Sequence, residues 1–326
     1  MAEKRRPAAA TPAPRKTYSR LGAERRIPSE YELVSSDLHY NYPRRFELGG
    51  DNPVIEWYYR YREGSALSAR DWERFIDPRR TTYREYNVLQ DRKEDVIDGL
   101  LREIDESEYD EHLSEEWVTF LDRWYGPLRY PCHGLQMLAA YIAQLAPASR
   151  VTNCGAFQAA DELRRVQRIA YRTAQLAAHR PGMKPDAHRQ RWEEAAPFQT
   201  LRQLVELALV TYDWGESLIV TNLVIKPMVD RLVNKELAGA LADANDDPML
   251  RGIHFSLDED ARWHRQWTAE LVRIAVEDTP ANGATIRGWI DAWSPLAEAA
   301  VAGLAAVTSM APVALDPEAV MARILQ

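Results

Sequence analysis

Apolar residues recur at helical spacing along most of the chain after about residue 92. The clearest case is Gly155–His179, where apolar side chains stand three or four positions apart and charged side chains lie on the opposite side of the helical wheel. The apolar positions are Ala156, Ala159, Ala160, Leu163, Val166, Ile169, Ala170 and Ala174, and the charged positions are Glu162, Arg165, Arg168 and Arg172. This pattern predicts a long amphipathic helix.

A second long helix is predicted from Phe198 to about Val229. It is apolar on most sides, so we expect it to be central. Further helices are predicted at Asp95–His112, Tyr130–Leu145, Asp230–Asp243, Leu257–Asp278, Ala284–Ala292 and Pro295–Ala311. No segment shows the period-two alternation of a strand, and no repeat of 20–50 residues is visible. The sequence therefore predicts an all-α fold, with long helices in a bundle.

The N-terminal part has a different composition. Residues 1–16 are rich in Ala, Pro and basic residues and predict a disordered basic tail, either solvated or lying on an acidic partner surface. Residues 17–90 are dense in Tyr and Trp with weak periodicity, which predicts an extended aromatic-rich arm. Such an arm would pack either on a neighbouring subunit or on the core of its own chain. Residues 91–326 are expected to form the helical domain.

Composition narrows the class of protein. The formal net charge of −8 argues against nucleic acid as a partner. Cys132 and Cys154 are the two cysteines, which suits buried thiols in a reducing cytoplasm. The N-terminus has no apolar segment typical of a signal peptide. The uncharged run Ala299–Leu315 is too short and too rich in Ala for a membrane span, so no membrane association is expected.

A helical bundle rich in carboxylates invites a test for a di-iron site. Such sites use Glu-x-x-His pairs, because an i,i+3 spacing places both ligands on one helical face. None of the seven histidines has an acidic residue three positions before it. The chain is therefore not expected to build this site unaided, and we assign it no catalytic, cofactor-binding or metal-binding residue.

Other candidate groups give weaker signals. Glu206, Asp213 and Glu216 would share one side of the Phe198–Val229 helix, either as a metal-binding or proton-relaying cluster or, as we favour, as ion-pair partners of inward arginines. The expected arginines are Arg129, Arg164, Arg165, Arg168 and Arg172. Cys132 and His133 are adjacent and point to different sides of a helix, so we interpret His133 as a core histidine.

Several segments together resemble the β (small) subunit of the hydroxylase of bacterial multicomponent di-iron monooxygenases. They occur in the order typical of the family over about residues 28–300, and their sequences most resemble those of the toluene and alkene/isoprene group. They include Pro28-Ser-Glu-Tyr-Glu-Leu-Val34, Tyr83-Arg-Glu-Tyr-Asn-Val-Leu-Gln-Asp91, Pro127-Leu-Arg-Tyr130, Tyr212-Asp-Trp-Gly-Glu-Ser217, Asn222-Leu-Val-Ile-Lys-Pro-Met228 and Trp293-Ser-Pro-Leu296.

The resemblance implies a ferritin-like helical bundle without metal, because in this family the di-iron centre belongs to the α subunit. It implies an (αβγ)2 assembly with α and γ subunits, served by an effector protein, a reductase and a Rieske ferredoxin. The complex would oxidise an aromatic or alkene hydrocarbon with O2 and NAD(P)H. The candidate residues for the subunit interface are Trp57, Tyr58, Tyr83, Tyr86 and Arg129.

Two alternatives to a non-catalytic structural subunit remain. The first is a self-contained ferritin-like di-iron carboxylate oxidase, which would need metal on Glu206, Asp213, Glu216, Asp161 or Glu162. The second is a helical adaptor without redox chemistry. Iron bound stoichiometrically by the purified chain would favour the oxidase.

Overall fold

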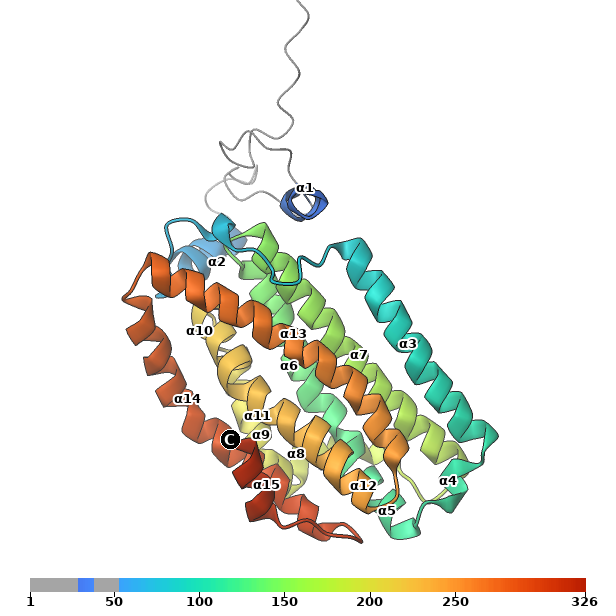
Figure 1. The fold of residues 1–326 in the computed structure, drawn as a ribbon. Helices are drawn as coiled ribbons and strands as arrows, with labels where there is room; N and C mark the ends of the chain where they lie inside the picture. Colours follow the sequence, from blue (N-terminus) through green and yellow to red (C-terminus); the bar gives the residue numbers. More distant parts are fainter. Residues whose placement is uncertain (1–28, 38–52) are drawn as a thin grey trace, which may run out of the picture.

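The computed structural model describes residues 29–37 and 53–326, and every regular element in these ranges is helical (Figure 1). This confirms the all-α prediction for the described part of the chain, whereas the tail expected at residues 1–16 lies outside it. The first elements are α1 (Glu30–Asp37), α2 (Pro53–Tyr58), η2 (Tyr59–Glu63), η3 (Trp72–Arg74), α3 (Tyr83–Glu106), α4 (Tyr109–His112), α5 (Glu115–Phe120), η4 (Leu121–Tyr125) and η5 (Gly126–Leu128). The middle elements are α6 (Arg129–Leu145), α7 (Ser149–His179), η6 (Pro185–Ala187), α8 (His188–Glu194) and α9 (Ala196–Leu209). The last are α10 (Trp214–Ile219), η7 (Val220–Ile225), α11 (Lys226–Asp230), η8 (Arg231–Leu241), α12 (Ala242–Ala244), α13 (Pro248–Asp278), α14 (Asn282–Ala305), η9 (Ala306–Met310) and α15 (Pro317–Ile324).

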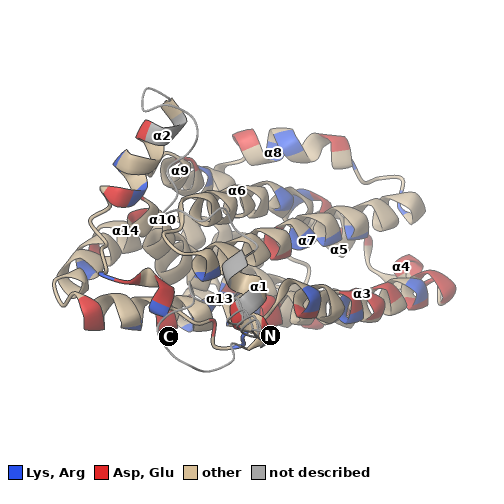
Figure 2. Ribbon diagram, turned by 90° about the horizontal axis from the view of Figure 1, so that it is seen from above, with Lys and Arg blue, Asp and Glu red and all other residues tan. Residues whose placement is uncertain are grey.

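Two helical hairpins form the centre of the bundle. The short Ala146–Ala148 turn joins α6 to α7, and Gly155 lets the two helices approach so closely that a Cβ there would lie 3.0 Å from the Ala143 backbone. The second hairpin pairs the continuous helical stretch 214–244 with α13. At the start of α13, the Asp247 side chain accepts a hydrogen bond from the backbone N–H of Leu250. The two hairpins pack on each other, α3 lies against α13, and α9 and α14 cover the other side (Figures 1 and 2).

The predicted helix Phe198–Val229 is wrong as a single element. The chain breaks at residues 210–213, where Asp213 caps a new helix by accepting hydrogen bonds from the backbone N–H groups of Gly215 and Glu216. From there the helical stretch continues through the expected boundary at Asp230, with π-helical hydrogen bonding in η7 and η8. Similarly, α13 begins nine residues before Leu257, and the two helices predicted after Ala284 are one helix, α14, with Pro295 inside it.

The N-terminal boundary of the helical domain also needs correction. The helix expected from Asp95 begins at Tyr83, where Thr82 and Glu85 form a capping box, so the boundary expected after residue 90 falls inside α3. Before it, residues 65–82 pack on the chain's own core rather than extending away. Phe75 is fully buried, and the Arg150 guanidinium donates a hydrogen bond to its carbonyl.

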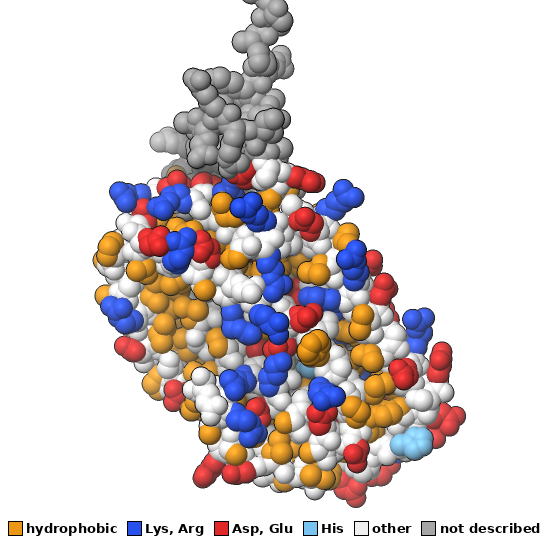
Figure 3. Space-filling view, viewed as in Figure 1, with side chains coloured by type: hydrophobic (Ala, Val, Ile, Leu, Met, Phe, Trp, Pro, Cys, Tyr) orange, Lys and Arg blue, Asp and Glu red, His pale blue; other side chains and the backbone are white. Residues whose placement is uncertain are grey.

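α14 with η9 (Asn282–Met310) is long and apolar enough to cross a membrane by length and composition, and 33% of the tested window is buried. The core helix of a bundle meets the same criteria, and α14 packs along α9 and η7. Apolar side chains gather on the surface over α14, at the left of the view in Figure 3.

Candidate functional site

A cluster of four buried charges lies between α7 and the 214–244 helix. Glu162 and Arg165 come from α7, and Lys226 and Asp230 come from α11, with exposed fractions of 4% or less. The Lys226 ammonium donates to Glu162 and lies 3.1 Å from Asp230 Oδ2. Arg165 Nη1 donates to Asp230 Oδ1 at 2.6 Å and to Glu162 Oε2 at 3.5 Å. We call these residues the core tetrad.

The charges of the core tetrad compensate one another. Burial opposes ionisation of Asp230, but Lys226 and Arg165 outweigh it and hold the pKa of this carboxyl below its usual range. Burial likewise opposes the charge of Lys226, and Asp230 and Glu162 outweigh it and raise the pKa of the ammonium. The formal charges of the two carboxylates and the two cations sum to zero, so each buried charge has a partner of opposite sign.

A hydrogen-bonded carboxyl lies beside the tetrad. Asp161 on α7 accepts hydrogen bonds from the Tyr86 hydroxyl and the Gln90 amide, each at 2.7 Å, and lies 2.8 Å from His264 Nε2. Burial raises the pKa of Asp161 to about 7, and burial lowers the pKa of His264 to about 3. The His264 imidazole is therefore neutral at neutral pH, and a hydrogen bond joins its Nε2 to the Asp161 carboxyl group.

A second buried histidine, His254 of α13, is linked to the tetrad through Asn234. Asn234 Oδ1 accepts from Arg165 Nη2 at 3.3 Å and lies 2.9 Å from His254 Nδ1. The amide oxygen can only accept, so Nδ1 carries the hydrogen and Nε2 accepts from the Tyr125 hydroxyl at 3.0 Å. Burial, with Arg165 as a second cause, lowers the pKa of His254 to about 3.

The core does not fit a metal ion. Among the residues that the structure describes, no group of three or more His, Cys, Asp or Glu side chains is placed to hold one. The Glu162 and Asp230 carboxylates face each other across the helices, but the Lys226 ammonium and the Arg165 guanidinium occupy the space between them. Such an arrangement offers neither free ligand oxygens nor a negative net charge to a cation.

The carboxylates proposed from the sequence do not come together. Glu206 is exposed and pairs with Arg202, Asp213 caps α10 and accepts from Ser65, and Glu216 accepts from the Trp293 indole. The arginines expected to pair with them bind other groups, because the break before α10 turns these positions apart. Of the five candidates for the alternative oxidase, only Asp161 and Glu162 are buried in the core.

Cys132 and Cys154 are buried, and burial raises the pKa of both thiols, that of Cys132 to about 11. This fits the prediction of unreactive thiols. The interpretation of His133 as a core histidine is wrong, because this side chain is exposed on α6.

α7 turns its charged side chains inward together with part of its apolar ones, and its exposed side carries no charge. Six of its seven charged residues are buried, and Arg168 is half-buried; the six are Arg150, Asp161, Glu162, Arg164, Arg165 and Arg172. Leu163 and Tyr171 are 43% and 54% exposed. The exposed positions of α7 are Ala156, Ala160, Leu163, Gln167, Tyr171, Ala174, Ala178 and His179, without any Asp, Glu, Lys or Arg. The exposed side of an amphipathic helix usually carries charged residues, so an uncharged exposed side of this length is unusual.

The adjoining helix α6 continues this uncharged surface. Its exposed positions are His133, Met137, Ala140 and Gln144, and Met137 is 41% exposed. α6 and α7 pack side by side, with their inner sides turned to the bundle core (Figure 2). We call the exposed positions of α6 and α7 together the α6/α7 outer face. Sequence periodicity showed the stripe on α7 but not its direction.

The interface candidates lie in different environments. Trp57 and Tyr83 are exposed, and Trp57 packs edge-on against Tyr212. Tyr58 is half-buried, and Arg129 donates to the Tyr130 hydroxyl. Tyr86 is buried in the core of its own chain, so it offers no surface to a partner.

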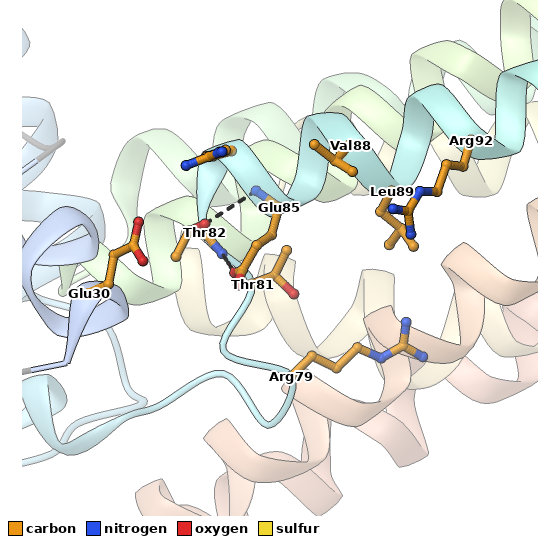
Figure 4. A pocket seen from close by; sticks show the side chains of 9 residues that line it. Glu30, Arg79, Thr81, Thr82, Glu85, Val88, Leu89 and Arg92 are labelled. Atoms are coloured by element: carbon orange, nitrogen blue, oxygen red, sulfur yellow. Dashed lines mark hydrogen bonds between the residues drawn. The ribbon is translucent and has the colours of Figure 1, made fainter.

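A pocket of about 410 Å³ lies between α1 and the start of α3 (Figure 4). Its charged lining residues are Glu30, Arg79, Arg84, Glu85 and Arg92, so both signs of charge are present. The lining contains no histidine or cysteine, and the pocket lies outside the bundle core. It adds no catalytic group to the site.

Comparison with known proteins identifies the family of this chain. Residues 57–279 match the family model described as Methane/Phenol/Alkene Hydroxylase. The chain belongs to this hydroxylase family. The chain is 41% identical, over 88% of both sequences, to the toluene-4-monooxygenase hydroxylase component subunit beta of Ectopseudomonas mendocina. It is 25% identical to the propane 2-monooxygenase hydroxylase component small subunit of Mycolicibacterium smegmatis, over 86% of this chain and 77% of that protein.

The solved structures agree with this placement. A chain of toluene 4-monooxygenase with toluene bound in its resting active site superposes with a TM-score of 0.85 at 39% identity, covering 91% of this chain and 98% of that chain. A xenon-pressurised phenol hydroxylase from Pseudomonas sp. OX1 shares the fold, with a TM-score of 0.76. The chain is thus a β-type, small subunit of a multicomponent monooxygenase hydroxylase with a ferritin-like fold. The predicted resemblance is confirmed.

Proposed function

We propose that this chain is the non-catalytic structural subunit of its hydroxylase, and that its α6/α7 outer face binds the larger, iron-bearing subunit. The observation that carries the proposal is the uncharged exposed side of α7. The chain has 41 Lys and Arg and 49 Asp and Glu residues, yet the α6/α7 outer face has none of them at its exposed positions. Interfaces are depleted of charge at their centre, and large uncharged apolar patches on a surface mark sites of association.

The size of the α6/α7 outer face fits a subunit contact. From Ala156 to Ala178 the α7 stripe is roughly 33 Å long at 1.5 Å per residue. With a helix about 10–12 Å wide, the α7 stripe alone covers roughly 350 Å², a little under half of the roughly 800 Å² that each partner contributes to a standard interface, and the shorter α6 stripe adds to it. Trp57 and Tyr83 would extend the contact outside this face.

The larger subunit is favoured over a second copy of this chain as the occupant. The similar proteins are described as a beta subunit or a small subunit of a hydroxylase component, and the name small subunit implies a larger one. Under this proposal the di-iron centre lies in the larger subunit. The complex is an (αβγ)2 assembly in the cytoplasm and oxidises an aromatic or alkene hydrocarbon with O2 and NAD(P)H. Effector protein, reductase and Rieske ferredoxin act on the whole complex.

The experiment introduces a charge on the α6/α7 outer face. Leu163→Glu and Ala160→Glu should abolish co-purification with a tagged larger subunit, because an unpaired carboxylate would be buried in the contact. Phe255→Glu is the matched control, since Phe255 is 60% exposed on α13, outside this face. Circular dichroism would establish that each variant is folded.

Two outcomes would contradict the proposal. In the first, folded Leu163→Glu co-purifies with the larger subunit at the wild-type ratio. In the second, the chain purified alone is a soluble protein with stoichiometric iron, which would favour the self-contained oxidase instead.

A further inference from the structure

The core tetrad has the spacing of a metal motif with the wrong side chain in it. Ferritin-like di-metal sites take Glu-x-x-His pairs from their helices, with both ligands directed inward. In α7, Glu162 is followed three residues later by Arg165, and both side chains are directed into the bundle. The guanidinium thus takes the position that histidine has in the motif, and it reaches across to Asp230 on the facing helix.

The other cation of the tetrad lies between carboxylates of the two helices. Lys226 contacts the Glu162 carboxylate of α7 and the Asp230 carboxylate of its own helix, so one ammonium joins oxygens from both helices. α11, which carries Lys226 and Asp230, lies between the π-helical segments η7 and η8. Such segments are rare and are frequent at functional sites.

Potential metal ligands remain around the tetrad in neutral form. His254 is hydrogen-bonded to Asn234, which also accepts a hydrogen bond from Arg165. His264 is hydrogen-bonded to Asp161, the residue that precedes Glu162 in α7. A buried ion-pair network is not needed for stability, since well-packed apolar residues serve as well. The presence of four buried charges therefore calls for another explanation.

We propose that Lys226 and Arg165 replace metal in this bundle core and keep divalent cations out of it. The two cations supply the positive charge that the Glu162 and Asp230 carboxylates require, and they occupy the ligand oxygens. A divalent ion entering the core would meet two positive charges that cannot leave. Metal in the hydroxylase is then restricted to sites outside this chain. The inference concerns this chain alone and holds whether or not the α6/α7 outer face binds the larger subunit.

The test removes both cations and restores the motif. In the full chain with Lys226→Met and Arg165→His, position 165 completes a Glu-x-x-His pair with Glu162. We expect this variant to bind about one equivalent of Co²⁺ and to show a visible d–d absorption band, with a melting temperature that rises with Co²⁺ concentration. The wild-type chain should bind no Co²⁺ stoichiometrically.

Two controls separate loss of charge from loss of a particular side chain. Lys226→Arg keeps the positive charge in the core and should bind no Co²⁺. Lys235→Met removes an exposed lysine of the same helix, paired with Asp258, and should also bind none. A folded double variant that binds no Co²⁺ would overturn the proposal, as would wild-type chain that binds one equivalent.

If the double variant does not fold without metal, refolding in the presence of Co²⁺ replaces the Co²⁺ titration. Recovery of folded chain with Co²⁺ but not with Mg²⁺ supports metal exclusion by the tetrad. The single variant Lys226→Gln provides a second measurement, because it leaves the core with one uncompensated carboxylate. Absence of Co²⁺-dependent recovery in the double variant, together with absence of Co²⁺-dependent stabilisation in Lys226→Gln, would overturn the proposal.

Discussion

At the scale of single residues, the core depends on which groups are charged. In the core tetrad Lys226 and Arg165 lower the pKa of Asp230 against the effect of burial, whereas burial holds His254 and His264 neutral, with the pKa of each at about 3. A group whose pKa is lowered in the folded state binds its proton first in the unfolded chain. Acidification below the ordinary histidine pKa of about 6.5 therefore favours unfolding.

Removal of His254 should weaken this pH dependence. The unfolded chain takes up a proton at His254 below about pH 6.5 and the folded chain does not until about pH 3, so wild-type stability falls in this window. Between pH 6.5 and pH 5 the wild type should lose about 1.5 kcal/mol more than His254→Gln, measured by denaturant unfolding. The difference between the two proteins isolates His254, because His264 and Asp161 titrate in both.

His133→Gln is the matched control, since this histidine is exposed. Its pH profile should follow that of the wild type. Parallel pH profiles of wild type and His254→Gln would show that His254 is not held neutral in the folded chain.

At the scale of helices, the α6–α7 hairpin depends on close approach of its backbones. Gly155→Leu should lower the free energy of unfolding by about 1–3 kcal/mol or more, because the new side chain meets the Ala143 backbone and not a flexible side chain. Thermal or urea unfolding would measure the loss.

A second glycine provides the opposite case. No atom lies within 4 Å of a Cβ added at Gly99 in α3, so Gly99→Ala should raise stability by about 0.5–1 kcal/mol through helix propensity alone. Equal effects of the two substitutions would contradict the assignment of Gly155 to a close helix contact.

Sequence periodicity predicted the helices better than their ends and directions. The α6 prediction was nearly correct, because Pro147 and a clear apolar pattern delimit it. The start of α3 was missed because Lys93 and Glu94 turn toward partners on α13 and α7, which weakens its apolar signal. The break before α10 was missed because Asp213 acts as a cap and not as a helical side chain.

The ion pairs of the core tetrad could not be predicted from the sequence. Arg165 and Asp230 are 65 residues apart, so nothing local shows that they pair. Periodicity places charged and apolar residues on opposite sides of α7, but the partners available on other helices decide which side is buried. The absence of Glu-x-x-His pairs, by contrast, could be read directly, because it depends on local spacing alone.

At the scale of the whole molecule, charge is distributed unevenly between surfaces. Lys and Arg side chains gather around α13 on the face shown in Figure 3, whereas the α6/α7 outer face has no Asp, Glu, Lys or Arg at its exposed positions. An association through charged patches and an association through the uncharged face would differ in their response to salt. At 0.15 M ionic strength charges act over about 8 Å, and at 1 M over about 3 Å.

Binding of the larger subunit should therefore be nearly independent of salt. If the α6/α7 outer face forms the contact, the dissociation constant should change less than about threefold between 0.15 M and 1 M NaCl, because apolar burial is not screened. Neutralising the α13 arginines, for example with Arg262→Gln and Arg265→Gln, should leave the affinity unchanged. Titration calorimetry at the two salt concentrations would measure both effects. A loss of affinity of a hundredfold or more in high salt, or on loss of these arginines, would move the contact from the uncharged face to the basic surface around α13.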